Sequence, residues 1–326
     1  MKTFLTKRYT NLFLLMAIFS LLLLSACGNT SNETSSKGKE SEPNKGDTYT
    51  VEHAMGSTEI SGTPKRIVIL TNEGTEALLS MGITPVGAVE SWLGDPWYDH
   101  IKKEMKNVKS VGTELEPSLE TIMSLKPDLI IGNKVRQEAI YDKLSQIAPT
   151  VFAENLGGDW KENFKLYSQA INNEEAGNKV LDDFDTRVAA LKKQLGDQLQ
   201  KKVSIVRFTV GDVRIYHKDS FSGVILDELG FARPESQNVN DLAEMNVTKE
   251  RIPAMDGDVL FHFAYETGDG EASKLQEEWT KDPIFQKLKV AEEGNVHQVD
   301  EAIWNTAGGV VAANLMLDDI EKFFLE

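Results

Sequence analysis

The chain has 326 residues, which exceeds the length that one hydrophobic core usually serves, so two lobes or domains are expected. Its 35 basic and 51 acidic residues give a formal net charge of −16, and a field of that sign repels phosphate backbones, which excludes general nucleic-acid binding. A single cysteine excludes a disulfide framework and a thiolate-rich metal site, and five histidines leave little material for a zinc or copper site.

The N-terminus carries the pattern of a secretion signal. Basic residues precede an apolar run over residues 11–26, which is shorter than a typical membrane span. The run ends in LSACG, which resembles the bacterial lipobox, whose cysteine is lipidated and becomes the first residue after cleavage. We therefore predict a lipoprotein signal peptide over residues 1–26 and a lipid anchor at Cys27, with an unmodified thiol behind an ordinary signal as the alternative. Cleavage removes three basic residues and changes the net charge from −16 to −19.

Residues 28–48 hold no apolar side chain that could nucleate a core. The segment 27–48 is therefore predicted to consist of the lipidated cysteine and a disordered tether. A lipid anchor followed by a flexible tether is expected to hold the folded part on the outer face of a bacterial cytoplasmic membrane. The length of the tether favours a Gram-positive cell envelope.

From Tyr49 onward, short β-rich runs alternate with helical ones. The expected strands are 66–70, 86–89, 129–131 and 151–153, and the expected helices between them are 75–81 and 119–125. The apolar runs IVIL and DLII are typical of a parallel sheet covered on both faces. This alternation predicts an N-terminal α/β lobe over residues 49–159.

A linking helical segment, residues 160–200, follows this lobe. Apolar residues from Val180 to Leu195 recur there at three- and four-residue steps, which predicts an amphipathic helix of six or seven turns. The α/β pattern resumes in a C-terminal lobe over residues 201–326, in the runs 203–208, 213–217, 221–229, 259–263, 296–299 and 307–324. The predicted fold is therefore α/β, with two α/β lobes joined by one long backbone helix and a ligand cleft between them. Helix-into-strand units recur in order on both sides of the helix, which favours an internal duplication.

Arginines at the ends of predicted strands are candidates for holding a ligand. Arg207 closes the strand VSIVRF, Arg214 lies in DVRIYH, and Arg136 follows the strand end in LIIGNKVR. In a chain of this acidity, a buried guanidinium costs several kcal/mol unless an anion pairs with it, and its planar fork suits carboxylate oxygens. We predict that all three face the cleft, with salt bridges to internal acids as the alternative.

Aromatic side chains occupy similar positions. Trp92 follows the strand VGAVE, Tyr216 lies two residues beyond the second of these arginines, and Trp304 precedes Asn305 in the loop before the final helix. Aromatic walls with a few cations suit a bulky, partly apolar anionic chelate. All four residues are predicted to line the cleft, with a place in the hydrophobic core as the alternative for any of the aromatic ones.

Three segments carry a resemblance to a known family. They are PKRIVILTNEGTEALLSMGITPVGAV, LETIMSLKPDLIIG and, near the end, IWNTAGGVVAANLMLDDI. With the lipobox, the tether and the two-lobe pattern, they make the chain similar to the helical-backbone (class III) substrate-binding proteins, which deliver iron–siderophore complexes, haem or cobalamin to ABC importers. The resemblance covers residues 50–326. Segments 66–89 and 304–320 look closest to the iron–siderophore branch, including members that take hydroxamate and citrate-type ligands.

The resemblance implies that two lobes clamp a ligand, with contacts from loops at the strand ends, and that the helical connection permits only small closure. It also implies that a glutamate on the outer rim of each lobe pairs with arginines of the membrane permease. Glu76 in TEALLSMG matches the first of these glutamates and Glu228 in GVILDELG matches the second. A solvated helical carboxylate is the alternative for each.

The predicted function is capture of a ferric siderophore, of a carboxylate or hydroxamate (citrate-type) kind, and its delivery to an ABC permease by a monomeric, lipid-anchored protein without enzymatic activity. A siderophore brings hard oxygen ligands for ferric iron, so neither a direct metal ligand nor a cofactor is expected. Haem or cobalamin is the alternative ligand, and a haem site would need an axial ligand from Tyr216, His217, His262 or Tyr265. A secreted hydrolase is the remote alternative, and the chain contains no G-x-S-x-G, H-E-x-x-H or P-loop pattern.

Overall fold

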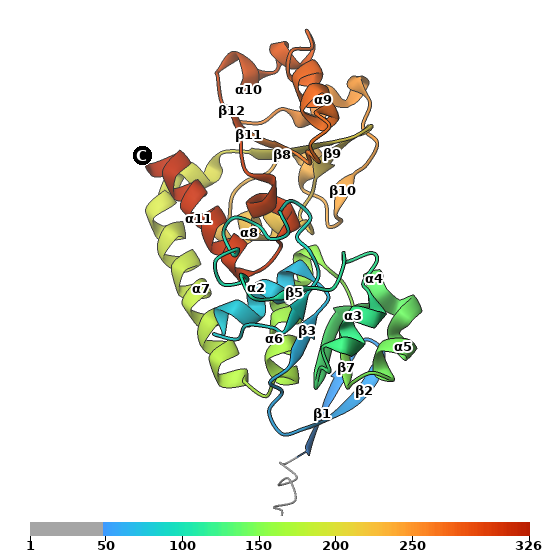
Figure 1. Ribbon diagram of the computed structural model, residues 1–326. Coiled ribbons are helices and arrows are strands. Elements are labelled where there is room, and N and C mark those ends of the chain that lie inside the picture. The colour runs from blue at the N-terminus through green and yellow to red at the C-terminus, as the bar shows by residue number, and fades with distance from the viewer. Residues whose placement is uncertain (1–47) are drawn as a thin grey trace, which may run out of the picture. The chain divides into compact units, whose positions relative to one another are not determined.

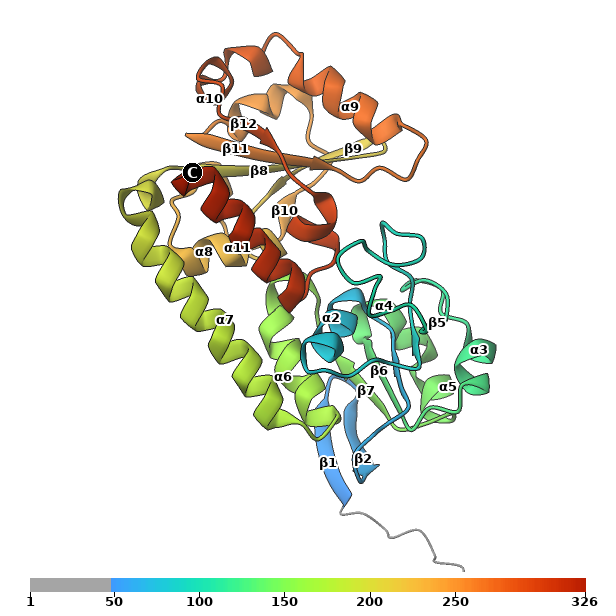
Figure 2. The same cartoon turned by 60° about the vertical axis from the view of Figure 1, so that its left-hand side comes forward.

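The computed structural model describes residues 48–326, which Figures 1 and 2 show from two directions. The predicted signal peptide (1–26), the lipid anchor at Cys27 and all of the tether except Thr48 lie outside the described residues. Within 48–326, no helix combines the length and the apolar character that crossing a membrane requires.

The N-terminal lobe is built on a five-stranded parallel sheet with the order β5-β4-β3-β6-β7. Its strands are β3 (Ile67–Ile69), β4 (Gly87–Ala88), β5 (Lys109–Ser110), β6 (Leu129–Asn133) and β7 (Thr150–Ala153). The helices between them are α2 (Asn72–Ser80), α3 (Leu119–Ser124), α4 (Lys134–Gln137) and α5 (Tyr141–Ser145). Every residue of β3, β6 and β7 is buried, which confirms the parallel sheet predicted from the apolar runs.

An antiparallel hairpin precedes this sheet, formed by β1 (Thr48–His53) and β2 (Gly56–Ser61). The sequence patterns did not indicate it, because its strands alternate between exposed and partly buried side chains and hold only two fully buried residues, Val51 and Ile60. The hairpin contacts β7, so it extends the lobe at the edge opposite β5.

The predicted long helix is α7 (Glu174–Leu195), whose 22 residues correspond to a length of about 33 Å. Its buried face repeats every three or four residues through Leu181, Phe184, Val188 and Leu191. A separate helix, α6 (Trp160–Ala170), precedes it. Asn172, with a positive φ of 53°, lies in the short connection between the two, so segment 160–200 holds two helices and a final 3-10 turn at Gly196–Gln200.

The C-terminal lobe contains a mixed five-stranded sheet with the order β10-β9-β8-β11-β12. Its strands are β8 (Val203–Thr209), β9 (Asp212–Tyr216), β10 (Ala243–Glu244), β11 (Val259–Ala264) and β12 (Val296–Gln298). Its helices are α8 (Phe221–Leu229), α9 (Glu271–Thr280) and α10 (Lys289–Glu292). Counted along the chain, the strands have the same order as in the N-terminal lobe, but β9 and β10 are each antiparallel to their neighbours.

The final helix of the chain, α11 (Val310–Leu325), is a second helical link between the two lobes. It packs against α7 along the side of the molecule and against α2 of the N-terminal lobe, and Figures 1 and 2 show it in red between them. The two α/β lobes and their helical connection confirm the predicted fold class.

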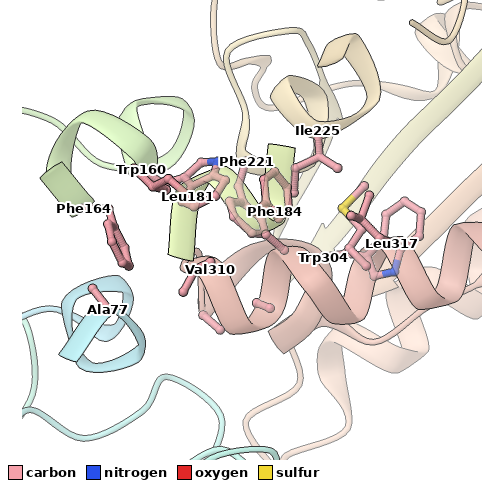
Figure 3. Packing of buried hydrophobic residues seen from close by; sticks show 14 of the residues in the cluster. Ala77, Trp160, Phe164, Leu181, Phe184, Phe221, Ile225, Trp304, Val310 and Leu317 are labelled. Atoms are coloured by element: carbon pink, nitrogen blue, oxygen red, sulfur yellow. The ribbon is translucent and has the colours of Figure 1, made fainter. Parts of the chain in front are cut away.

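One buried apolar cluster is shared by both lobes and the connecting helices (Figure 3). Its members include Ala77, Trp160, Phe164, Leu181, Phe184, Phe221, Ile225, Trp304, Val310 and Leu317. The rings of Trp160 on α6 and Phe184 on α7 meet edge to face at 5.1 Å between centroids. The helical connection between the lobes is therefore part of one continuous, close-packed core.

Candidate ligand-binding cleft

A cavity of about 1060 Å³ lies where the carboxyl ends of strands from both sheets converge. The N-terminal lobe contributes residues that follow β3 to β7, among them Glu73, Trp92, Glu114, Arg136 and Asp159. The C-terminal lobe contributes Arg207, Arg214, Tyr216, Tyr265 and Asn305, which lie on β8 and β9 or follow β11 and β12. Ligands of open α/β sheets bind at this end of the strands, so the cavity is the candidate site.

Arg207 and Arg214 lie directly opposite each other on the antiparallel strands β8 and β9, and both line the cavity. Directly paired residues of antiparallel strands point to the same face, so the two guanidinium groups are neighbours. Arg214 donates from Nε to Oδ2 of Asp212 at 2.6 Å and keeps part of its side chain exposed. The C-terminal lobe therefore lines the cleft with two neighbouring guanidinium groups, each of which also pairs with an acid.

Arg207 is largely buried and forms an ion pair with Glu301, with 2.5 Å between Nη2 and Oε1. Its Nη1 donates to the hydroxyl of Tyr216 at 3.3 Å, its Cζ lies 5.1 Å from the ring centroid of Tyr265, and its Nε has no partner among the described residues. Arg207 thus lines the cleft, as predicted, and also pairs with an internal acid, which was the alternative.

Glu301, the partner of Arg207 in this ion pair, makes two further contacts. Its carboxylate also accepts from Nδ2 of Asn305 at 2.9 Å and from the hydroxyl of Thr306 at 2.7 Å. Burial raises the pKa of Glu301, while the charge of Arg207 and these hydrogen bonds oppose the rise. Glu301 therefore orients both Arg207 and Asn305 toward the cleft.

On the opposite lobe, Arg136 belongs to α4, and its Cζ lies 5.6 Å from the ring centroid of Trp92. Its Nε lies 3.6 Å from Oε2 of Glu114, a buried carboxylate whose Oε1 accepts from the backbone and side chain of Asn72 at 2.7 and 2.8 Å. Burial raises the pKa of Glu114. The pattern of Arg207 and Glu301 thus recurs here, with a cleft arginine placed beside a buried acid.

Glu73 is a third buried acid at the cleft, in the first turn of α2. Its Oε1 accepts from Nδ2 of Asn163 at 2.8 Å and from the hydroxyl of Tyr167 at 2.7 Å, whereas Oε2 has no partner among the described residues. Burial raises the pKa of Glu73 to about 8, because the stabilising hydrogen bonds only partly offset the loss of solvent.

Trp92, Tyr216 and Asn305 line the cavity, as the sequence predicted. Trp92 meets Tyr265 across the cleft: the ring centroids are 6.5 Å apart in an edge-to-face arrangement, and the hydroxyl of Tyr265 donates to the carbonyl of Trp92 at 3.3 Å. The two lobes therefore touch through an aromatic pair at the edge of the site.

Trp304 does not line the cleft, and its predicted position there is wrong. It is fully buried, its ring centroid lies 4.6 Å from that of Phe261, and its Nε1 donates to Oδ2 of Asp319 at 2.8 Å. The segment Ala302–Thr306 forms a π-helical turn rather than an open loop. Asn305 of this turn lines the cleft, whereas Trp304 packs into the shared core, as Figure 3 shows.

Glu76 is not an exposed rim residue, which corrects the position that the resemblance implied. Its side chain has no solvent exposure, Oε2 accepts from the backbone N–H of Ala312 at 2.9 Å, and Oε1 lies 2.6 Å from Nε2 of His100. Glu76 thus joins α2 to the first turn of α11. Glu228 on α8 is partly exposed and pairs with Lys161 at 2.8 Å.

Glu73, Glu114 and Glu301 were not predicted as cleft residues, and Tyr265 was named only as a possible axial ligand of the alternative haem site. Glu73 and Glu114 were detectable in principle, because each follows a strand of the N-terminal sheet by a few residues. Nothing in the sequence distinguishes them from the many surface acids, since burial depends on which loops pack together. Among residues 48–326, no group of three or more His, Cys, Asp or Glu side chains is placed to hold a metal ion.

Two α/β lobes, a packed helical connection and a polar cleft at the carboxyl ends of both sheets define a two-lobe ligand-binding protein. Residues 67–302 match the sequence model of the periplasmic binding protein family, and the chain belongs to this family. This confirms the resemblance inferred from the sequence segments.

Three similar proteins illustrate the family. The chain is 53% identical over 321 residues to the probable siderophore-binding lipoprotein YfiY of Bacillus subtilis, covering 96% of this chain and 97% of that protein. It is 31% identical over 319 residues to the Fe(3+)-citrate-binding protein YfmC of Bacillus subtilis, covering 94% and 96% of the two chains. The crystal structure of Staphylococcus aureus SirA complexed with staphyloferrin B is similar with a TM-score of 0.79 and 36% identity, covering 85% of this chain and 98% of SirA.

Proposed function

We propose that the protein captures a ferric siderophore in the cleft between its lobes and presents it to the permease of an ABC importer. The observation that carries the proposal is the directly opposed pair Arg207 and Arg214 on the cleft wall. Each guanidinium group carries five N–H donors, and Glu301, Tyr216 and Asp212 use only some of them, so the pair suits a protein whose ligand is an anion. Guanidinium forks pair well with carboxylate oxygens, and a carboxylate-bearing chelate is therefore the ligand class that fits.

The wall of the cleft on the N-terminal lobe favours a bulky ligand over a small anion. Arg136 and the ring of Trp92 stand on the N-terminal lobe, and Tyr265 faces them from the C-terminal lobe. Aromatic faces beside cations suit a partly apolar chelate that wraps its iron in oxygen ligands of its own. The similarity to a Fe(3+)-citrate-binding protein and to a protein solved with staphyloferrin B supports the same class.

The proposal extends to location and delivery. A lipid at Cys27 and the tether that follows hold the folded part, with its lobes over residues 49–159 and 201–326 and the linking segment 160–200, as a monomer on the outer face of the membrane. Glu228, which is partly exposed, is the candidate for contact with the permease. Because Glu228 pairs with Lys161, binding to the permease would replace Lys161 with a cationic side chain of the permease.

Fluorescence titration tests the proposed ligand class. We expect saturable quenching of tryptophan fluorescence by ferric complexes of citrate-type, carboxylate-bearing siderophores, and little response to haemin or cobalamin. W92F should lose most of the quenching, because Trp92 lines the cleft, whereas W279F should keep it, since Trp279 packs in a separate core of the C-terminal lobe. Saturable quenching by haemin or cobalamin alone would remove the siderophore assignment.

A further inference from the structure

We propose that Glu73 is a specificity-determining residue of the cleft: its carboxyl group, protonated on Oε2, donates a hydrogen bond to an anionic oxygen of the bound chelate. This inference rests on the proposed function and adds to it a neutral donor among the cleft arginines. It also adds a dependence of ligand capture on pH.

Two neighbouring donors fix which oxygen of Glu73 carries the proton. Nδ2 of Asn163 donates both to Oε1 of Glu73 and to the carbonyl of Asn155, each at 2.8 Å, so both of its hydrogens are used. Reversing this amide would place its oxygen against two acceptors. The hydroxyl of Tyr167 donates to the same Oε1. Oε1 therefore accepts two hydrogen bonds, and the proton belongs on Oε2. Oε2 is a buried oxygen without a partner among the described residues, on a side chain that lines the cavity.

The charges around Glu73 distinguish it from the other buried acids of the cleft. Glu114 lies beside Arg136 and Glu301 lies beside Arg207, so each has a guanidinium to stabilise its ionised form. Glu73 forms no ion pair with any of residues 48–326. A buried carboxyl without a cation is neutral over a wide range of pH.

The groups that face Glu73 from the surrounding elements reinforce this neutrality. Glu114, after β5, and Asp159, before α6, are acids that disfavour a further negative charge. Tyr167 of α6 supplies a neutral hydroxyl, and α11 approaches the backbone of Glu73 with Gly309, which has no side chain. Burial therefore raises the pKa of Glu73 to about 8, with the two acids adding to the rise.

A neutral acid and an ionised one act in opposite ways on an anionic ligand. The protonated carboxyl donates a strong O–H···O⁻ hydrogen bond, whereas the carboxylate repels the same oxygen. A bound anion also holds the proton more firmly, so binding above the pKa of Glu73 requires uptake of one proton. We therefore expect the affinity to be constant up to pH 8, where the pKa of Glu73 lies, and to fall by up to about tenfold for each further pH unit.

The experiment measures the affinity of the full-length protein for a ferric citrate-type chelate from pH 6.5 to 9.5 by tryptophan quenching. E73Q keeps an acceptor for Asn163 and Tyr167 and a permanent N–H donor toward the cleft. It should bind within about threefold of the unaltered protein at pH 7 and lose the decline at high pH. E73A, which removes the donor, should weaken binding at pH 7 by about tenfold or more. E120Q, an exposed glutamate of α3 outside the cleft, is the matched control and should keep the decline.

The comparison of E73Q with the unaltered protein at each pH cancels any change in the chelate itself, and it decides the matter even if E73A does not fold. A profile of the unaltered protein that is flat, or one that E73Q shares, overturns the inference while leaving the proposed function in place. Failure of the unaltered protein to bind any ferric chelate overturns the proposed function and this inference together.

Discussion

Arg207 illustrates how a single side chain serves both the fold and the cleft. Its ion pair with Glu301 and its hydrogen bond to Tyr216 hold the guanidinium in place, and its unpartnered Nε leaves one donor free among the described contacts. A cation that is positioned in advance gives up little side-chain entropy when an anion binds. We therefore propose that Arg207 is the main electrostatic anchor of the ligand.

Replacing Arg207 tests this role. R207A should weaken binding of a carboxylate-bearing chelate by about 2–5 kcal/mol, which is roughly 30-fold or more. It should also lower stability, because Glu301 loses its partner in a buried position. The double variant R207A/E301Q removes that orphan charge, so we expect its melting temperature to recover while its affinity does not. R251A, at an exposed ion pair with Glu244, is the control. Unchanged affinity in R207A would assign the residue to the scaffold alone.

For single residues, the sequence predicted which strand end a side chain follows better than it predicted whether that side chain is buried. Arg136 and Arg207 were placed correctly because the carboxyl ends of parallel strands meet at one edge of a sheet. Arg214 reaches the same cleft from the antiparallel strand β9, where it lies opposite Arg207. Trp304 was misplaced because the direction of its side chain depends on a π-helical turn that no residue pattern announces. Glu73 was missed because its burial is produced by α6, a helix that lies some ninety residues further along the chain.

At the scale of elements, the contact between α2 and α11 shows how the N-terminal lobe is fastened to the end of the chain. The first turn of α11 has backbone N–H groups without helical partners, and the carboxylate of Glu76 accepts one of them at Ala312. Gly309 precedes this turn, and a Cβ there would lie 2.6 Å from Oε2 of Glu76. A glycine is thus required for the close approach of the two helices.

This contact predicts that Glu76 acts on stability. E76A should lower the free energy of unfolding by about 1–3 kcal/mol, since it removes a buried acceptor from the helix terminus and from His100. E228A removes a partly exposed pair and should cost less than about 1 kcal/mol. Chemical denaturation followed by circular dichroism measures both. Full stability in E76A would show that the contact between Glu76 and the first turn of α11 does not stabilise the fold.

The elements themselves were largely predictable, and the exceptions have local causes. Strands β3, β6, β8 and β11 were recognisable because short, continuous apolar runs bounded by polar residues are typical of strands buried on both faces of a sheet. The two-residue strands β4 and β5 carry too little pattern for their pairing to be read. The break between α6 and α7 occurs at Asn172 with its positive φ, a conformation that asparagine tolerates but does not require.

At the scale of the whole molecule, each lobe has its own β-sheet, but the two lobes share one hydrophobic core. Each sheet has a local apolar cluster on one side, yet the largest cluster joins α2, α6, α7, α8 and α11. We therefore propose that the lobes move by only small adjustments when a ligand binds, because the shared core resists larger displacements. The aromatic pair Trp92 and Tyr265, which already bridges the cleft, fits a site that closes over a short distance.

A shared core also predicts that the lobes unfold together. Calorimetry should show one transition, with equal calorimetric and van't Hoff enthalpies, although the chain exceeds the size of most two-state domains. L317A removes a fully buried side chain of the shared cluster and should cost about 2–5 kcal/mol while moving the whole transition to lower temperature. L325A, on the exposed end of the same helix, should change stability by no more than about 0.5 kcal/mol. Splitting of the L317A transition into two, with one lobe unchanged, would show that the lobes are stabilised independently and that the helices only connect them.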